Sequence, residues 1–185
     1  MGREARYLHA FRQIGKALNT TLSVEQRLKV MAQGMVLALG IKGSTIRLLD
    51  EECKTLVLAA SCGLSDQYFE KGDVLPEKSV SEAMFGQVTL IKDARQDPRI
   101  QYPEAVEREG IVSMLALPIK VRGEVKGMLK LHATEERDFS AEEIEFASSL
   151  AEQGGLAIEN ARLYEQKCQE LQYLRAITEV ARAVG

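Results

Sequence analysis

The chain opens with two stretches in which apolar residues recur every three or four positions, the spacing of one face of an α-helix. The first covers residues 7–18 and predicts an N-terminal helix that leads into the domain. Ser23 and Gln26 then have the spacing of a capping box, in which each side chain bonds the other residue's backbone N–H. The apolar period continues until Gly40, so a second helix is predicted over residues 24–39.

Beyond the second helix the period changes from near four to two, which is the spacing of a β-strand. Residues 44–50 and 54–61 form one predicted strand pair, joined by an acidic turn. Residues 111–119 and 125–133 form another pair, with Arg122-Gly123-Glu124 as the turn. Apolar and polar residues alternate over 44–50 and 125–133, whereas 54–61 is a β-like run and 111–119 is an apolar run. The sequence therefore predicts two β-hairpins.

The residues between the two hairpins, about 63–110, carry no long period. Short helices are expected at 80–85 and 104–109, and a short strand at 88–91. The stretches between them are polar and loop-like. The sequence therefore predicts a middle segment of loops and short elements.

The last 45 or so residues follow one helical pattern. Ser140 and Glu143 mark its start as a second capping box, and only Gly154-Gly155 interrupts the pattern before residue 184. A helix of this length far exceeds the usual range of about 8 to 20 residues and is typical of a coiled coil or of a single helix that bridges two domains. Apolar residues recur in steps of three, four and seven at Leu150, Ala157, Ala161, Tyr164, Cys168 and Leu171. We expect these residues to line a homodimer contact between two such helices.

The composition narrows the classes of function. A formal net charge of −3 over 185 residues gives no electrostatic reason to bind nucleic acid. No apolar run approaches the roughly 18 residues of a membrane span, and the N-terminus is charged where a signal peptide is apolar. We therefore expect a cytoplasmic protein without membrane insertion. Three widely spaced cysteines and two histidines do not predict a metal site.

Several motifs stand on these elements in a fixed order. They are Gly40-Ile-Lys-Gly-Ser-Thr-Ile-Arg-Leu-Leu-Asp50, Ser61-Cys-Gly-Leu-Ser-Asp-Gln-Tyr68, Asp93-Ala-Arg-Gln-Asp-Pro-Arg99, Gly110-Ile-Val-Ser-Met-Leu-Ala-Leu-Pro-Ile119 and Gly123-Glu-Val-Lys-Gly-Met-Leu-Lys-Leu131. With these motifs the chain resembles the GAF domain family, the small-molecule-sensing modules of phosphodiesterases, phytochromes and bacterial sensor histidine kinases. The second hairpin is the most specific part of the resemblance.

The resemblance implies an α+β fold, an α/β sandwich built on a central antiparallel β-sheet. The N- and C-terminal helices would cover one face, and the middle segment would roof a ligand pocket on the other face. We expect an N-terminal helix over 1–22, the GAF domain over 23–164 and a coiled-coil signalling helix over 165–185.

In such a fold the long helices would bury the apolar strand faces, which carry Ile46, Leu48, Val125, Leu129 and Leu131. The polar faces would point toward the pocket. The candidate ligand-binding residues are Thr45, Arg47, Met128, Lys130 and His132. Their charged and polar groups favour an anionic or carbonyl-bearing ligand. The alternative is that they are ordinary solvent-facing residues on a half-covered sheet.

The better-defined ligands of the family have no matching signature in this sequence. Covalent bilins are tethered by a cysteine commonly followed by histidine, and none of the three cysteines precedes one. The Asn-Lys-x-Phe-Asp-Glu signature of cyclic-nucleotide-binding members is absent, and haem ligation would rest on His132 alone. The cofactor, if any, is therefore unknown.

The function that we expect is a non-enzymatic sensor that relays ligand occupancy through paired helices to an output domain outside this chain. A structural dimerisation module with an empty pocket is one alternative. Cys53 and Cys62, nine residues apart, leave a free methionine sulfoxide reductase as another, against which the long C-terminal helix argues. A match of apolar positions between residues 8–18 and 174–184 further suggests that the chain is a fragment ending inside a second module.

Overall fold

The computed structural model describes residues 7–9, 12, 14–16, 23–50 and 52–184. Its elements, in chain order, are α2 (Val24–Leu39), β1 (Gly43–Leu49), β2 (Leu56–Cys62), α3 (Asp66–Phe69), α4 (Ser81–Met84), β3 (Thr89–Ile91), α5 (Pro103–Arg108), β4 (Ser113–Val121), β5 (Glu124–Ala133) and α6 (Ala141–Val184). Much of the predicted N-terminal helix lies outside the described residues. Those of its residues that are described, 7–9, 12 and 14–16, are helical.

Helix α2 has the bounds predicted from its end signals. The backbone N–H of Gln26 donates to Ser23 Oγ over 3.3 Å, and Ser23 N–H donates to Gln26 Oε1 over 3.0 Å, which completes the capping box. At the other end Gly40 adopts φ +61°, a left-handed conformation that suits glycine, and its N–H donates to the carbonyl of Val36.

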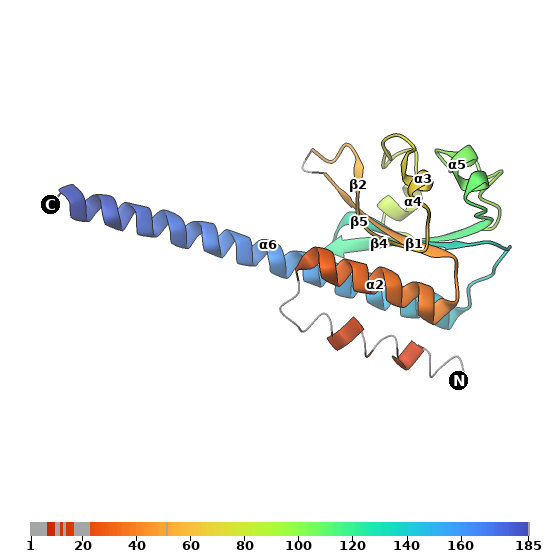
Figure 1. Cartoon of the computed structure of the whole chain (residues 1–185), viewed down its shortest axis with the longest axis horizontal. Helices are drawn as coiled ribbons and strands as arrows, with labels where there is room; N and C mark the ends of the chain where they lie inside the picture. Colours follow the sequence, from red (N-terminus) through yellow and green to blue (C-terminus); the bar gives the residue numbers. More distant parts are fainter. Residues whose placement is uncertain (1–6, 10–11, 13, 17–22, 51, 185) are drawn as a thin grey trace.

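Five antiparallel strands form one sheet in the order β2-β1-β5-β4-β3. Figure 1 shows α2 and the first part of α6 side by side beneath the sheet, with α3, α4 and α5 on the opposite side. We call the segments on that opposite side, residues 63–88 and 92–110, the roof. The fold is therefore the predicted α+β sandwich with a helix-covered face and a roofed face.

Alternation along the strands divides the buried apolar residues into two cores. Ile46, Leu129 and Leu131 belong to the core between the sheet and the long helices. Met128 belongs to the core between the sheet and the roof. Val125 was expected on the helix side, but it belongs to neither core, because a bulge between Ile119 and Lys120 shifts the β4–β5 pairing at that point.

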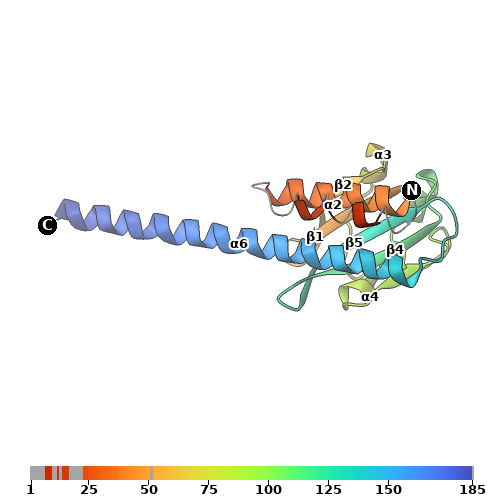
Figure 2. The same ribbon diagram turned by 90° about the horizontal axis from the view of Figure 1, so that it is seen from below.

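Helix α6 runs unbroken over 44 residues, and its C-terminal half projects beyond the domain (Figures 1 and 2). The glycine pair that interrupts its sequence pattern allows the helix to approach its neighbours closely. A Cβ atom on Gly155 would overlap the carbonyl oxygen of Lys120 on β4, and one on Gly154 would lie 2.8 Å from the Met31 side chain of α2. These glycines set the distance at which α6 packs on the domain.

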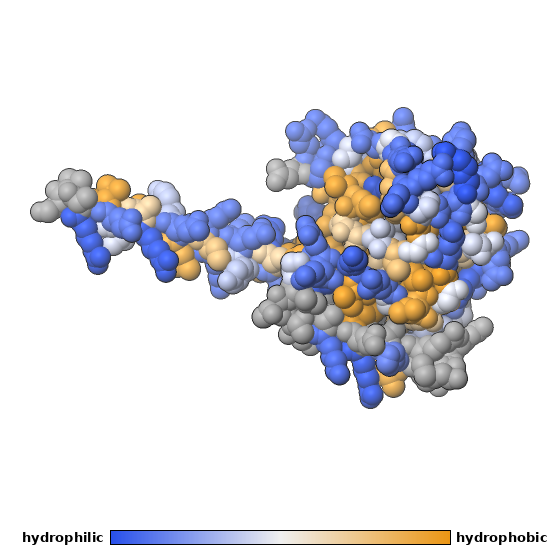
Figure 3. Space-filling model, in the orientation of Figure 1, coloured by the Kyte–Doolittle hydropathy of each residue, from blue (hydrophilic) through white to orange (hydrophobic). Residues whose placement is uncertain are grey.

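The predicted dimer stripe of α6 divides into a buried and an exposed part. Leu150 and Ala157 are 1% and 4% exposed and fill the domain's own interior, so they are not available to a second chain. The apolar stripe is needed there to cover the sheet. Farther along, Tyr164 and Leu171 are 71% and 57% exposed, while Ala161 and Cys168 are half-buried. Apolar side chains of the projecting part remain visible on the surface in Figure 3.

Candidate functional site

A cavity of about 30 Å³ lies between the sheet and the roof, at the place predicted for a ligand pocket. It is lined by Thr45, Arg47, Tyr68, Lys71, Val74, Ser79, Ile100, Gln101, Tyr102, Val106, Met114 and Lys130. Strands β1, β4 and β5 supply its floor, and the roof supplies the other residues. This volume accommodates about one water molecule, so this conformation leaves little free space for a ligand.

Three cationic side chains meet at the cavity, and each has an electrically neutral partner. Arg47 Nη1 donates to the carbonyl of Leu56 over 2.9 Å, and Lys130 Nζ donates to Ser79 Oγ over 2.6 Å.

The third cation, Lys71, places its Nζ 3.2 Å from the centre of the Tyr68 ring, a cation–π contact. Among the residues that the structure describes, no aspartate or glutamate lines the cavity. The cavity therefore gathers positive charge without a carboxylate in its wall to neutralise it.

This arrangement lowers the pKa values of all three cations. Burial, followed by the charge of Arg47, lowers the pKa of Lys130 to about 7. Burial, followed by the charges of Arg47 and Lys130, lowers the pKa of Lys71 to about 7, although Glu109 acts in the opposite direction. The pKa of Arg47 is also lowered by burial. At neutral pH each lysine is therefore poised to gain or lose a proton when its surroundings change.

His132 points to the roofed side of β5, but it is not among the residues that line the cavity. Its ring is fully buried, with Nε2 3.2 Å from Thr45 Oγ1 and the edge of the Tyr68 ring against it. Burial, followed by the charges of Lys130, Lys71 and Arg47, lowers its pKa well below 6.5. His132 is therefore a neutral residue that contacts two residues of the cavity wall, Thr45 and Tyr68.

The predicted site residues thus fall into two groups. Thr45, Arg47 and Lys130 reach the cavity. Met128 and His132 lie on the same side of the sheet without lining it, and Met128 packs in the roof-side core.

The roof residues Tyr68, Lys71 and Ser79 line the cavity and were not predicted. Ser65 starts α3 by accepting a hydrogen bond from the Tyr68 N–H, and this short helix turns the Tyr68 ring inward. The sequence of this stretch, Tyr68-Phe69-Glu70-Lys71, has no periodic pattern that marks it as a pocket wall.

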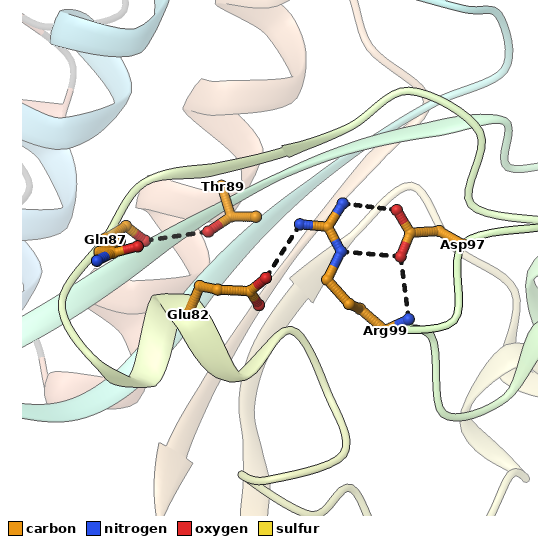
Figure 4. Close-up of polar contacts among 5 residues, drawn as sticks. All are labelled: Glu82, Gln87, Thr89, Asp97 and Arg99. Atoms are coloured by element: carbon orange, nitrogen blue, oxygen red, sulfur yellow. Dashed lines mark hydrogen bonds and ion pairs between the residues drawn. The ribbon is translucent and has the colours of Figure 1, made fainter.

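Helix α4 of the roof is fastened by an ion-pair network shown in Figure 4. Arg99 binds both carboxylate oxygens of Asp97, at 2.8 and 2.6 Å, and donates to Glu82 of α4 over 3.1 Å. The side-chain hydrogen bond from Arg99 lowers the pKa of Asp97. Next to this network, buried Val80 adopts φ +54°, a conformation that is costly for a β-branched residue. The roof beside Ser79 is thus held in a strained conformation by Arg99.

The two cysteines considered for redox chemistry are not brought together. Cys53 lies in the turn before β2, and Cys62 is the last residue of that seven-residue strand. At about 3.3 Å per strand residue they are separated by roughly 20 Å or more, well beyond disulfide range. All three cysteines are free thiols.

Within the described residues, no group of three or more His, Cys, Asp and Glu side chains is placed to hold a metal ion. Over the same residues, no helix combines the length and apolar character that crossing a membrane requires.

Comparison with known proteins identifies the class to which this fold and pocket belong. The family model of the GAF domain matches residues 21–159, which is most of the chain, and the chain therefore belongs to the GAF domain family. No curated protein matches the chain.

Solved structures of GAF domains and of a sensor-kinase domain are similar to it. The GAF domain of a phosphoenolpyruvate-protein phosphotransferase from Coxiella burnetii is 25% identical, with a TM-score of 0.76, and the match covers 88% of this chain and 98% of that one. The corresponding Acinetobacter domain is 22% identical, with a TM-score of 0.69, over 84% and 94% of the two chains. A domain of a putative two-component sensor histidine kinase from Sinorhizobium meliloti is 20% identical, with a TM-score of 0.67, over 80% and 99%.

Proposed function

We propose that this chain is a small-molecule-sensing regulatory module of the cytoplasm. It binds a ligand in the roofed cavity and relays occupancy through paired α6 helices to an output domain outside this chain. The observation that carries the proposal is the cavity itself, where Arg47, Lys71 and Lys130 converge without a carboxylate in the wall. Such unneutralised charge is costly to a protein that gains nothing from it, which favours a role of these side chains in binding a ligand.

The contacts between the sheet and α6 supply a route for the signal. Lys130 lies on β5, whose turn to β4 carries Arg122. Arg122 forms an ion pair with Glu159 of α6, and α6 also packs on the backbone of β4 at Gly155. A shift of the floor strands on ligand binding would therefore reach α6 at two points.

The projecting part of α6 supplies the second element of the relay. Apolar side chains there are at least one-third exposed, namely Leu163, Tyr164, Leu171, Tyr173, Leu174, Ile177 and Val180. Pairing with the same helix of a second chain would bury them. A ligand shifts the equilibrium between two arrangements of this helix pair only to the extent that it binds one arrangement more tightly than the other.

A structural dimerisation module is the second candidate, and the small volume of the cavity favours it. Native mass spectrometry of the purified chain separates the two candidates. Our proposal predicts a dimer that retains a small molecule or takes one up from a metabolite mixture, and a Lys130→Met dimer that does not. A dimer that never carries added mass would support the dimerisation module. A monomer at concentrations well above micromolar would contradict both candidates.

A further inference from the structure

We propose that the cavity recognises a compact anion, a carboxylate or phosphate group, which Arg47, Lys71 and Lys130 bind together. This inference rests on the proposed function and names the chemistry of its ligand. A carbonyl-bearing neutral ligand would satisfy the hydrogen-bond donors of the three side chains but would leave their charges uncompensated. An anion does both.

The present partners of the three cations are ones that an anion can replace. Ser79 Oγ and the Tyr68 ring are neutral acceptors, whereas an anionic oxygen would add the attraction of a full opposite charge in a partly buried site. The guanidinium of Arg47 uses Nη1 on Leu56, and no other hydrogen bond from that group is seen among the described residues. It therefore retains donors for a second acceptor.

The nearest carboxylate does not substitute for the anion. Glu109, at the end of α5, forms an ion pair with Lys42 at 3.2 Å and accepts hydrogen bonds from the N–H and hydroxyl of Ser65. The carboxylate of Glu109 is thus already paired with Lys42 and Ser65. The other titratable groups facing the lysines are Tyr68 and Tyr102 of the roof and neutral His132 of β5. None of these is a carboxylate.

The size of the site points to a compact ligand. A cavity of about 30 Å³ accommodates an anion only after Ser79 releases Lys130 and the adjoining roof moves. Ser79 precedes Val80, the buried residue held at φ +54°. Exchange of the Ser79 hydroxyl for an anionic oxygen would thus free the roof at its strained position. The ligand would replace one hydrogen bond and change the conformation in the same step.

Binding of an anion is expected to take up protons. Lys71 and Lys130, whose pKa values lie near 7, become fully charged beside a negative group because that group raises their pKa. The affinity should therefore weaken as the pH rises, by roughly tenfold for each lysine that takes up a proton, between about pH 7 and pH 8.5.

Isothermal titration calorimetry on the full chain tests the inference. The probes are malonate for a carboxylate source, inorganic phosphate for a phosphoryl source, and malonamide as the neutral analogue of malonate. We expect malonate or phosphate to bind with millimolar or better affinity, malonamide not to bind, and malonate binding to weaken at higher pH. Lys130→Met and Lys71→Gln should each reduce anion affinity at least tenfold, and the exposed-lysine control Lys120→Met should not.

Several results would overturn the inference. They are the absence of malonate and phosphate binding up to about 20 mM, equal binding of malonamide, or unchanged affinity in both lysine variants. Binding of a neutral molecule that Lys130→Met does not weaken would refute the anion while leaving the sensory function standing. A chain that retains and binds no small molecule in the native mass spectrum would instead remove the sensory function itself.

Discussion

Lys130→Met is expected to stabilise the ligand-free protein. Burial lowers the pKa of this lysine from its ordinary value of 10.5 to about 7. At 1.36 kcal/mol per pH unit the difference corresponds to at most about 5 kcal/mol of unfavourable burial at neutral pH. Partial access of water to the side chain reduces this cost, and losing the hydrogen bond to Ser79 removes about 1 kcal/mol of stability. Because methionine has similar length and no charge, we expect a net gain of about 2 kcal/mol.

The gain should depend on pH in a defined direction. The folded protein binds fewer protons than the unfolded chain between pH 7 and 10.5, so the cost of burying Lys130 is fully present below about pH 7 and disappears as the pH approaches 10.5. Urea unfolding of the wild type and Lys130→Met at pH 7 and pH 9.5 measures this directly. The gain should be less than half as large at the higher pH, because most of the cost has gone by then.

Lys120→Met is the matched control, because Lys120 is exposed on the neighbouring strand β4. It should change the free energy of unfolding by no more than about 0.5 kcal/mol. If the Lys130→Met protein is less stable than the wild type at pH 7, or if its gain is equal at both pH values, then burial of the charged Lys130 amine does not destabilise the folded protein.

Three further predictions concern the packing of α6 on the domain, the projecting part of α6 and the roof. Gly155→Ala should lower the free energy of unfolding in urea by on the order of 3 kcal/mol, because the new Cβ meets backbone atoms. Gly154→Ala should lower it by only about 1 kcal/mol, because the new Cβ meets a flexible side chain. Equal losses would contradict the close packing of α6. Leu171→Asp should turn the dimer into monomer in sedimentation analysis, and Gln169→Asp on the opposite face should not; a persistent dimer would place the interface elsewhere. Arg99→Met should speed amide hydrogen exchange in α4 at least tenfold, because two carboxylates lose their cation, while the exchange rates of α6 should not change. Unchanged exchange in α4 would show that the network does not fasten the roof.

Local signals predicted much of the fold. Capping boxes at Ser23 and Ser140 position the starts of α2 and α6, because a cap is formed within a few residues of the chain. Period-two alternation placed Thr45, Arg47 and Lys130 on the roofed face, because a strand's side chains alternate whatever packs on them.

What the sequence did not predict depends on contacts between distant segments. Lys71 and Ser79 reach the cavity through a roof without periodicity, so no pattern distinguished them from surface residues. The apolar stripe of α6 was assigned wholly to a dimer contact, yet Leu150 covers the sheet of its own domain. A heptad pattern does not show whether its partner is another helix or a sheet. The bulge beside Lys120 likewise shifted Val125 away from its expected core.

Pulsed electron–electron double resonance tests most directly whether occupancy of the cavity changes the pairing of α6. Spin labels on Gln169→Cys, an exposed position on the face of the projecting helix opposite Leu171, in a chain carrying Cys53→Ser, Cys62→Ala and Cys168→Ala, report the distance between two protomers. When the anion found to bind by calorimetry is present at a saturating concentration, we predict a second distance population displaced by about 2 Å or more. Identical distance distributions with and without the bound anion would contradict it.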